Sequence, residues 1–185
     1  MAHKINPDGY DAGTYRGLAD IFEFRNGDGD LRKFNCGQAA ACTFLTHHGR
    51  LPTAANPDLA CDVMRLIETD HPPDNVGGWF GTSRRRVERI CQAHGIDLEE
   101  VSGEVELRER LDRGQPVIVM VGTEGPKVWR WTAPAGHWMV AFGYDDKYLY
   151  LTNGAVPGMP WDEFRGWWGA LVPRMISMRN RGLAA

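Results

Sequence analysis

Long hydrophobic runs are absent from this sequence of 185 residues, whose apolar stretches extend over only a few residues each. A helix that spans a bilayer needs ~20 predominantly apolar residues. The opening MAHKINPDGY also lacks the apolar core of a secretory signal. We therefore expect a cytoplasmic protein that makes no use of a membrane, with export by a route that needs no cleavable signal as the open alternative.

A surplus of positive charge is missing as well. The sequence carries 21 Lys and Arg residues against 24 Asp and Glu residues, so its formal net charge is −3. Such a balance does not favour binding to a phosphate backbone, and we predict no nucleic-acid partner. With 43% hydrophobic and 24% charged residues the composition is that of a globular protein, which excludes wholesale disorder and a coiled coil.

Cysteine is scarce, and no two cysteines have the C-x-x-C spacing of a zinc site or a redox motif. The four cysteines are Cys36, Cys42, Cys61 and Cys91. They are too few for a disulfide scaffold in a chain of this length. His47 and His48 are neighbours that point in different directions on a helix, so they form no metal site by themselves. We predict no metal and no cofactor, and a cysteine is then of interest for its reactivity.

Helical patterns dominate the first 115 residues of the chain. An Ala-rich helix of about 12 residues starts at Cys36 and ends before Gly49, and Asn35 has a side chain suited to N-capping it. Three further helices are expected over about residues 57–69, 82–94 and 105–113. Residues 1–33 are mostly polar, and we expect them to form an N-terminal extension packed on the core.

Strand patterns follow the helices. Strands are expected at residues 116–122, 137–144, 147–153 and 171–178, and a short helix at 160–168. The junction between the second and third of these strands predicts a tight hairpin. Helices first and antiparallel strands second indicate an α+β fold, and residues 34–185 are expected to form one domain, with the whole chain a single domain.

Three residues in this pattern have the properties of a cysteine nucleophile and its partners. Cys36 lies at a helix N-terminus, where unpaired N–H groups and the positive end of the helix dipole favour the thiolate. His137 opens a strand, and Asn153 ends the strand that pairs with it, so the hairpin brings the two together. Each residue alone is more often structural, but the ordered set predicts a nucleophile, a base and a group that orients the base.

Four blocks of the sequence form an ordered set of motifs: NCGQAA at 35–40, GQPVIV at 114–119, GHWMVAFGYDD at 136–146 and WDEF at 161–164. They resemble motifs of the C39-like branch of the papain-like cysteine peptidases, and NCGQAA resembles the N/D-C-G-x-A-A nucleophile motif of that family. They occur in the family's order, and the resemblance covers about residues 34–178.

The resemblance implies a papain-like fold, with a helical half packed on an antiparallel sheet and a cleft between them. It implies that Cys36 is the nucleophile, His137 the general base and Asn153 the orienting residue, although the family usually has Asp at this last position. A peptide or protein would be the substrate, and a peptide or isopeptide bond would be cleaved through an acyl-thioenzyme.

One departure from the family concerns the oxyanion. Asp30 stands where the family commonly has a glutamine that donates to the oxyanion, and an ionised carboxylate cannot donate. The backbone N–H of Cys36 remains, and the side chains of Asn35, Gln38 and Asn26 are candidate substitutes.

Two alternatives to a peptidase stay open at this stage. One is an acyl transferase of the same chemistry, related to transglutaminases or transpeptidases, in which an amine or a thiol resolves the thioester. The other is a catalytically silent papain-like module that only binds. Trp129 and Trp131 precede His137 and are candidates for an apolar wall of a substrate site in either kind of enzyme.

Overall fold

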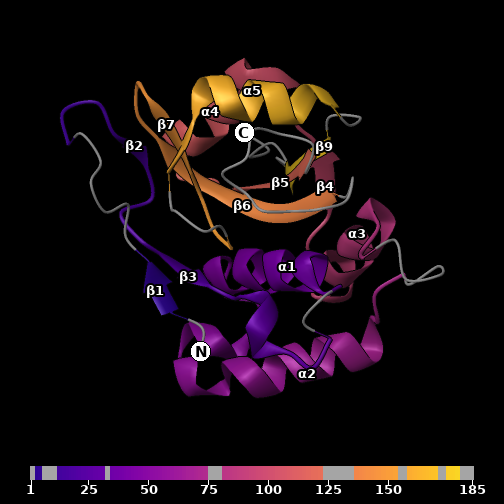
Figure 1. Ribbon diagram of the computed structural model, residues 1–185. Coiled ribbons are helices and arrows are strands. Elements are labelled where there is room, and N and C mark those ends of the chain that lie inside the picture. Colours follow the sequence, from indigo (N-terminus) through magenta and orange to yellow (C-terminus); the bar gives the residue numbers. More distant parts are fainter. Residues whose placement is uncertain are drawn as a thin grey trace, which may run out of the picture.

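The computed structural model describes residues 3–5, 12–31, 34–74, 81–122, 136–153, 158–170 and 174–179 of the chain. Within them, helices lie on both faces of a central antiparallel sheet (Figure 1). The helices are α1 (Cys36–His47), α2 (Ala60–Asp70), α3 (Arg84–Ala93), α4 (Gly103–Asp112) and α5 (Trp161–Ala170), with 3-10 turns η1 (Asn26–Asp28), η2 (Pro52–Ala54) and η3 (Pro57–Leu59). Among the residues described, no helix combines the length and the apolar character that crossing a membrane requires.

The central sheet has the strand order β4-β9-β5-β6-β7-β8, with β2 paired to β6 outside this path. Its strands are β2 (Arg16–Gly17), β4 (Leu98–Glu100), β5 (Val117–Gly122), β6 (Gly136–Tyr144), β7 (Tyr148–Leu151), β8 (Gly158–Pro160) and β9 (Arg174–Met178). The described strand pairs are antiparallel, and β1 (His3–Ile5) pairs separately with β3 (Ile21–Glu23). The long central strand β6 therefore contacts β5 on one edge and β7 on the other.

Helix α1 is the central helix of the molecule. Every residue from Cys36 to Thr46 is buried, which is expected of a helix whose sequence is apolar or small on all sides. It contacts β6 on one side and α2 and α3 on the others, as Figure 1 shows. The first turn of α1 is thus held firmly against the sheet.

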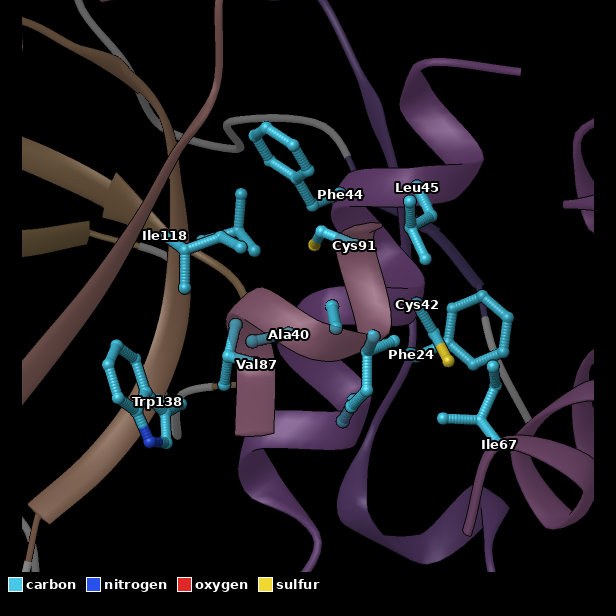
Figure 2. Close-up of a cluster of buried hydrophobic side chains, with 14 of the residues drawn as sticks. Phe24, Ala40, Cys42, Phe44, Leu45, Ile67, Val87, Cys91, Ile118 and Trp138 are labelled. Atoms are coloured by element: carbon cyan, nitrogen blue, oxygen red, sulfur yellow. The ribbon is translucent and has the colours of Figure 1, made fainter. Parts of the chain in front are cut away.

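Two hydrophobic cores lie on the two faces of the sheet. The first is formed with α1, α2 and α3, and Figure 2 shows Ile118 and Trp138 of the sheet facing Val87 and Cys91 of α3. The second lies between the sheet and the helices α4 and α5. In β6, Trp138, Val140 and Phe142 belong to the first core, while Met139 and Ala141 belong to the second. This alternation is the consequence of the two-residue period of a strand that is covered on both faces.

The predicted helices and strands are present, with shifts of a few residues at their ends. The helix expected at 57–69 begins as the 3-10 turn η3, where the Asn56 side chain accepts the N–H of Asp58, and continues as α2. The predicted hairpin is confirmed, since Asp145 accepts the N–H groups of Lys147 and Tyr148, each at 2.7 Å. Strands β2, β4 and β8 were not predicted because segments this short are strands only through their neighbours.

The segment from residue 12 to residue 31 contacts both the sheet and α1. Strand β2 pairs with β6, and β3 packs on α1, where the backbone N–H of Phe24 donates to Thr43 Oγ1 at 2.9 Å. Ile21 and Phe24 belong to the first core. This segment therefore brings its polar residues close to the start of α1.

Candidate active site

Cys36 is the first residue of α1, and only 7% of its surface is exposed. The N–H groups of the first turn have no partner within a helix, and the helix dipole is positive at this end. Both features stabilise a negative charge on the sulfur. The structure therefore places the thiol where the sequence analysis expected it.

Asn35 is the N-cap residue of α1, but the prediction that its side chain caps the helix is wrong. Its amide nitrogen instead donates to Glu68 Oε1 at 2.5 Å and to the backbone oxygen of Asn26 at 3.0 Å. Glu68 is a buried carboxylate of α2 that also accepts the N–H of Asp30 at 2.8 Å. A buried carboxylate needs donors, so the amide is oriented by its bonds to Glu68 and Asn26. Its Oδ1, the atom that would cap the helix, is left without a hydrogen-bond partner.

His137 is the second residue of β6 and is buried. The β6–β7 hairpin returns the chain to it, with a register shift between Ala141 and Gly143. Thr152 anchors the returning chain through two hydrogen bonds to Val140, at 2.9 and 3.1 Å. As a result, Asn153 lies beside the imidazole, as the pairing of the two strands predicts.

The side chains of Cys36 and His137 form a hydrogen bond. Burial raises the pKa of the Cys36 thiol, but this bond, the charge of His137 and the backbone N–H groups of Trp138 and Gly37 together lower that pKa below its ordinary value. Burial lowers the pKa of His137, but the bond to Cys36, the charge of the sulfur and the Asn153 carbonyl together raise it. The opposite shifts are those of a thiolate–imidazolium pair.

Asn153 contacts the imidazole through its backbone. His137 Nε2 lies 3.0 Å from the carbonyl oxygen of Asn153, and a carbonyl only accepts, so Nε2 carries the proton. The Nδ1 atom is then the ring nitrogen that faces the sulfur. Asn153 has a φ of 57°, a left-handed conformation that asparagine tolerates better than most residues. Its side chain points elsewhere, and its Nδ2 donates to Asn26 Oδ1 at 2.7 Å.

Gln38 lies two residues after Cys36, in the first turn of α1, and is fully buried. Its Nε2 donates to the backbone oxygen of His71 at 2.9 Å, and its Oε1 accepts from Thr82 Oγ1 at 2.6 Å. The carbonyl of Thr82 accepts in turn from Trp138 Nε1 at 2.6 Å. Gln38 thus connects the first turn of α1 to the segment before α3 and to β6.

Gly37 is required for this packing, and replacing it with alanine is expected to destabilise the protein. An added Cβ would lie 2.4 Å from Cβ of Thr82, closer than real Cβ atoms come. Moving Thr82 would strain its bonds to Gln38 and Trp138, and we expect a loss of about 1–3 kcal/mol. Thermal unfolding measures this, with Gly166→Ala as a control, since a Cβ at Gly166 meets nothing within 4 Å. If Gly37→Ala melts like the wild type, the contact with Thr82 is not a tight one.

The remaining sequence candidates lie apart from the thiol or outside the described residues. Asp30, at the position of the family's glutamine, has a 72% exposed side chain and pairs with Arg65 at 3.4 Å. Trp129 and Trp131 lie outside the residues that the structure describes. In the described part of the chain, no three Asp, Glu, His or Cys residues gather as ligands of a metal ion.

Two residues, Glu23 and Thr82, make contacts at the site that were not predicted from the sequence. Glu23 is a buried carboxylate whose Oε1 accepts the backbone N–H of Asn153. Thr82 joins Phe34, Gln38 and Trp138. For Glu23 a signal was present, because strand alternation across Ile21–Glu23 puts the carboxylate on the same inward face as Ile21. For Thr82 the sequence carries no such signal.

No protein-family model matches the sequence, and no curated protein matches it. The fold does match that of a solved structure, a protein from Bacillus anthracis that has been proposed to be a C39-like peptidase. The TM-score is 0.58 and the sequence identity 15%, over 80% of this chain and 90% of that chain. At this identity the likeness shows a distantly related fold, with mixed helices and antiparallel sheet, and leaves the reaction to be argued from the site.

Proposed function

We propose that this chain is a papain-like cysteine peptidase or amidase that cleaves a peptide or isopeptide bond through an acyl-thioenzyme on Cys36. The observation that carries the proposal is the hydrogen bond between Cys36 and a buried His137 whose Nε2 is held by the Asn153 carbonyl at 3.0 Å. The likeness to a structure proposed to be a C39-like peptidase supports it at the level of the fold.

The proposed reaction has two steps that share one histidine. The Cys36 thiolate attacks the carbonyl carbon of the scissile bond, and the carbon–nitrogen bond breaks as His137 Nδ1 gives its proton to the leaving amine. Neutral His137 then takes a proton from water, which attacks the thioester carbon. The carbon–sulfur bond breaks, the acid is released, and Cys36 returns as the thiolate beside the imidazolium.

The oxyanion formed in each step would be stabilised first by the backbone N–H of Cys36 at the open start of α1. The two hydrogens of the Asn35 amide have partners in Glu68 and Asn26, and Gln38 is fully buried with its amide bonded to His71. A side-chain contribution from Asn35 or Gln38 would therefore require those partners to be exchanged when substrate binds.

The test that needs no substrate is the pH dependence of iodoacetamide labelling at each cysteine, followed by mass spectrometry. Because the pKa of Cys36 is lowered and that of His137 raised, the thiolate forms at a lower pH than in a free thiol, and the imidazolium persists to a higher pH than in a free imidazole. We expect Cys36 to react well below pH ~8.5, the pKa of a free thiol. Cys42 and Cys91, whose pKa values burial raises, serve as internal controls in the same spectra. Equal reactivity of Cys36, Cys42 and Cys91 would contradict the proposal.

A second experiment separates hydrolysis from acyl transfer and from binding alone. Peptide amide and ester substrates are incubated with the wild type and with Cys36→Ala, with and without an added amine. Free acid as the product supports the peptidase, whereas an amine conjugate indicates a transferase. A reactive Cys36 without any product or acyl-enzyme would favour the silent binding module.

A further inference from the structure

Glu23 is the last residue of β3, and its side chain is buried with 2% of the residue exposed. Both of its carboxylate oxygens accept hydrogen bonds. Oε1 accepts the backbone N–H of Asn153, and Oε2 lies 2.6 Å from Arg25 Nε, an ion pair whose arginine is half exposed. Burying a carboxylate is costly unless it is paired in this way, so its place beside Asn153 is well defined.

Glu23 accepts a hydrogen bond from Asn153, the residue whose carbonyl contacts His137. The N–H of Asn153 binds Glu23, and its carbonyl oxygen lies 3.0 Å from His137 Nε2. Asn153 is also in the left-handed region, with a φ of 57°. The N–H and the carbonyl of Asn153 belong to successive peptide planes that meet at its Cα. The bond to Glu23 fixes the first plane and, with this φ, limits where the carbonyl can point.

The short segment after Glu23 ties the same loop to the start of α1. Asn26 accepts from the Asn153 side chain at 2.7 Å, and its backbone oxygen accepts from Asn35 at 3.0 Å. Phe24 anchors the segment on Thr43 of α1 at 2.9 Å. The segment 23–26 thus bridges the helix that carries the thiol and the strand end that faces the histidine.

We propose that Glu23 is a positioning residue for His137, acting through the backbone of Asn153 without touching the reacting atoms. It supplies a hydrogen-bond acceptor that keeps the Asn153 carbonyl directed at Nε2, so that Nδ1 stays directed at Cys36. This role rests on the proposed function, because it matters to chemistry only if His137 is the partner of the thiol.

The test compares Glu23→Gln with Glu23→Met. Both remove the charge that pairs with Arg25, but only glutamine keeps an oxygen that can accept the Asn153 N–H. The readouts are the pKa of His137, from NMR titration of its ring, and the labelling rate of Cys36 at about pH 6. Because the Asn153 carbonyl raises the pKa of His137, Glu23→Met should lower it by about half a unit or more and slow labelling, while Glu23→Gln stays near the wild type.

The control pair is Glu104→Gln and Glu104→Met. Glu104 also pairs with arginines, Arg108 and Arg165, but it belongs to α4 on the other face of the sheet. Neither variant should move the pKa of His137. If the Glu104 variants move it as much as Glu23→Met does, the effect is general destabilisation and the inference is overturned. Equal effects of Glu23→Gln and Glu23→Met, or none from either, also overturn it.

Cys36→Ala separates this inference from the proposed function. If removing the thiol leaves the pKa of His137 unchanged, there is no ion pair and the proposed function itself fails. If Cys36→Ala lowers that pKa while Glu23→Met does not, only the role of Glu23 fails. If Glu23→Met does not fold, amide hydrogen exchange of Asn153 in the wild type decides. A protected amide supports the bond to Glu23, and an amide that exchanges like a free one overturns it.

Discussion

Replacing His137 with alanine is expected to lower the rate of Cys36 alkylation at about pH 6 by roughly 10²–10³-fold. Without the imidazolium, burial raises the pKa of the thiol and only the backbone N–H groups of Trp138 and Gly37 still lower it, so the lowering that His137 supplies is lost. A thiol with the ordinary pKa of ~8.5 is less than about 1% thiolate at this pH. Rates at each cysteine are measured by mass spectrometry in the wild type and the variant.

His94→Ala is the matched control for this substitution. His94 follows α3, and its Nδ1 bonds the backbone oxygen of Ile90, so the variant removes an imidazole without touching the thiol. Its Cys36 should react like that of the wild type. An unchanged rate in His137→Ala would mean that Cys36 is activated by something else, and the proposed two-step reaction would lose its base.

Asn153→Gly should keep most of the reactivity of Cys36, whereas Asn153→Val should lose it by about tenfold or more. The contact with His137 is made by a backbone carbonyl, which glycine retains, and glycine adopts a φ of 57° without strain. Valine is β-branched, and holding it in the left-handed region costs about 1–3 kcal/mol. The backbone at residue 153 would then adopt another φ, and its carbonyl would lose the contact with His137 Nε2. The labelling rate of Cys36 at about pH 6 measures both variants.

Asn26→Ala completes this comparison, because it removes the partner of the Asn153 side chain and leaves residue 153 itself intact. Suppose that Cys36 labels as slowly in Asn153→Gly as in His137→Ala, but at the wild-type rate in Asn26→Ala. Then the side chain of Asn153 orients the histidine, and the backbone contact is incidental. Reactivity in both Asn153→Gly and Asn26→Ala assigns the orientation to the carbonyl.

The backbone contact also gives a physical reason for one departure from the resembled family. That family usually has Asp where this chain has Asn153, which would suggest a loss of charge beside the histidine. Here the side chain of residue 153 bonds Asn26 and the carbonyl faces Nε2, so the acceptor does not depend on a carboxylate at this position. A buried carboxylate is nevertheless close by, because Glu23 binds the N–H of the same residue.

The departure at Asp30 has a different meaning. Its side chain is directed to the surface and pairs with Arg65, while its backbone N–H binds Glu68. The segment that would carry the family's glutamine is therefore fastened to α2 through a buried carboxylate. If the proposed function holds, the candidates for oxyanion stabilisation among the described residues are the start of α1 and a side chain that changes its partner.

Much of the fold was predictable because its signals are local. The Ala-rich pattern after Asn35 predicts a helix, and Gly49 marks where it ends. The apolar run at 117–122 predicts a strand, and it is a strand of the central sheet. The hairpin followed from its turn residues. The short strands β2 and β8 carry no such pattern, since two or three residues become a strand only where a neighbour supplies the hydrogen bonds.

The sequence by itself determined that a cysteine opens a buried helix, that a histidine opens a long strand, and that a hairpin brings Asn153 back to that histidine. These features depend on helix and strand periodicity and on turn residues, which act over a few positions. The tertiary structure alone decided three contacts. Asn153 contacts His137 through its backbone carbonyl, the Asn35 amide donates to Glu68, and Glu23 accepts the N–H of Asn153. Such partners are far apart in the chain, and they are chosen when buried polar groups compete for the donors and acceptors that packing brings within reach.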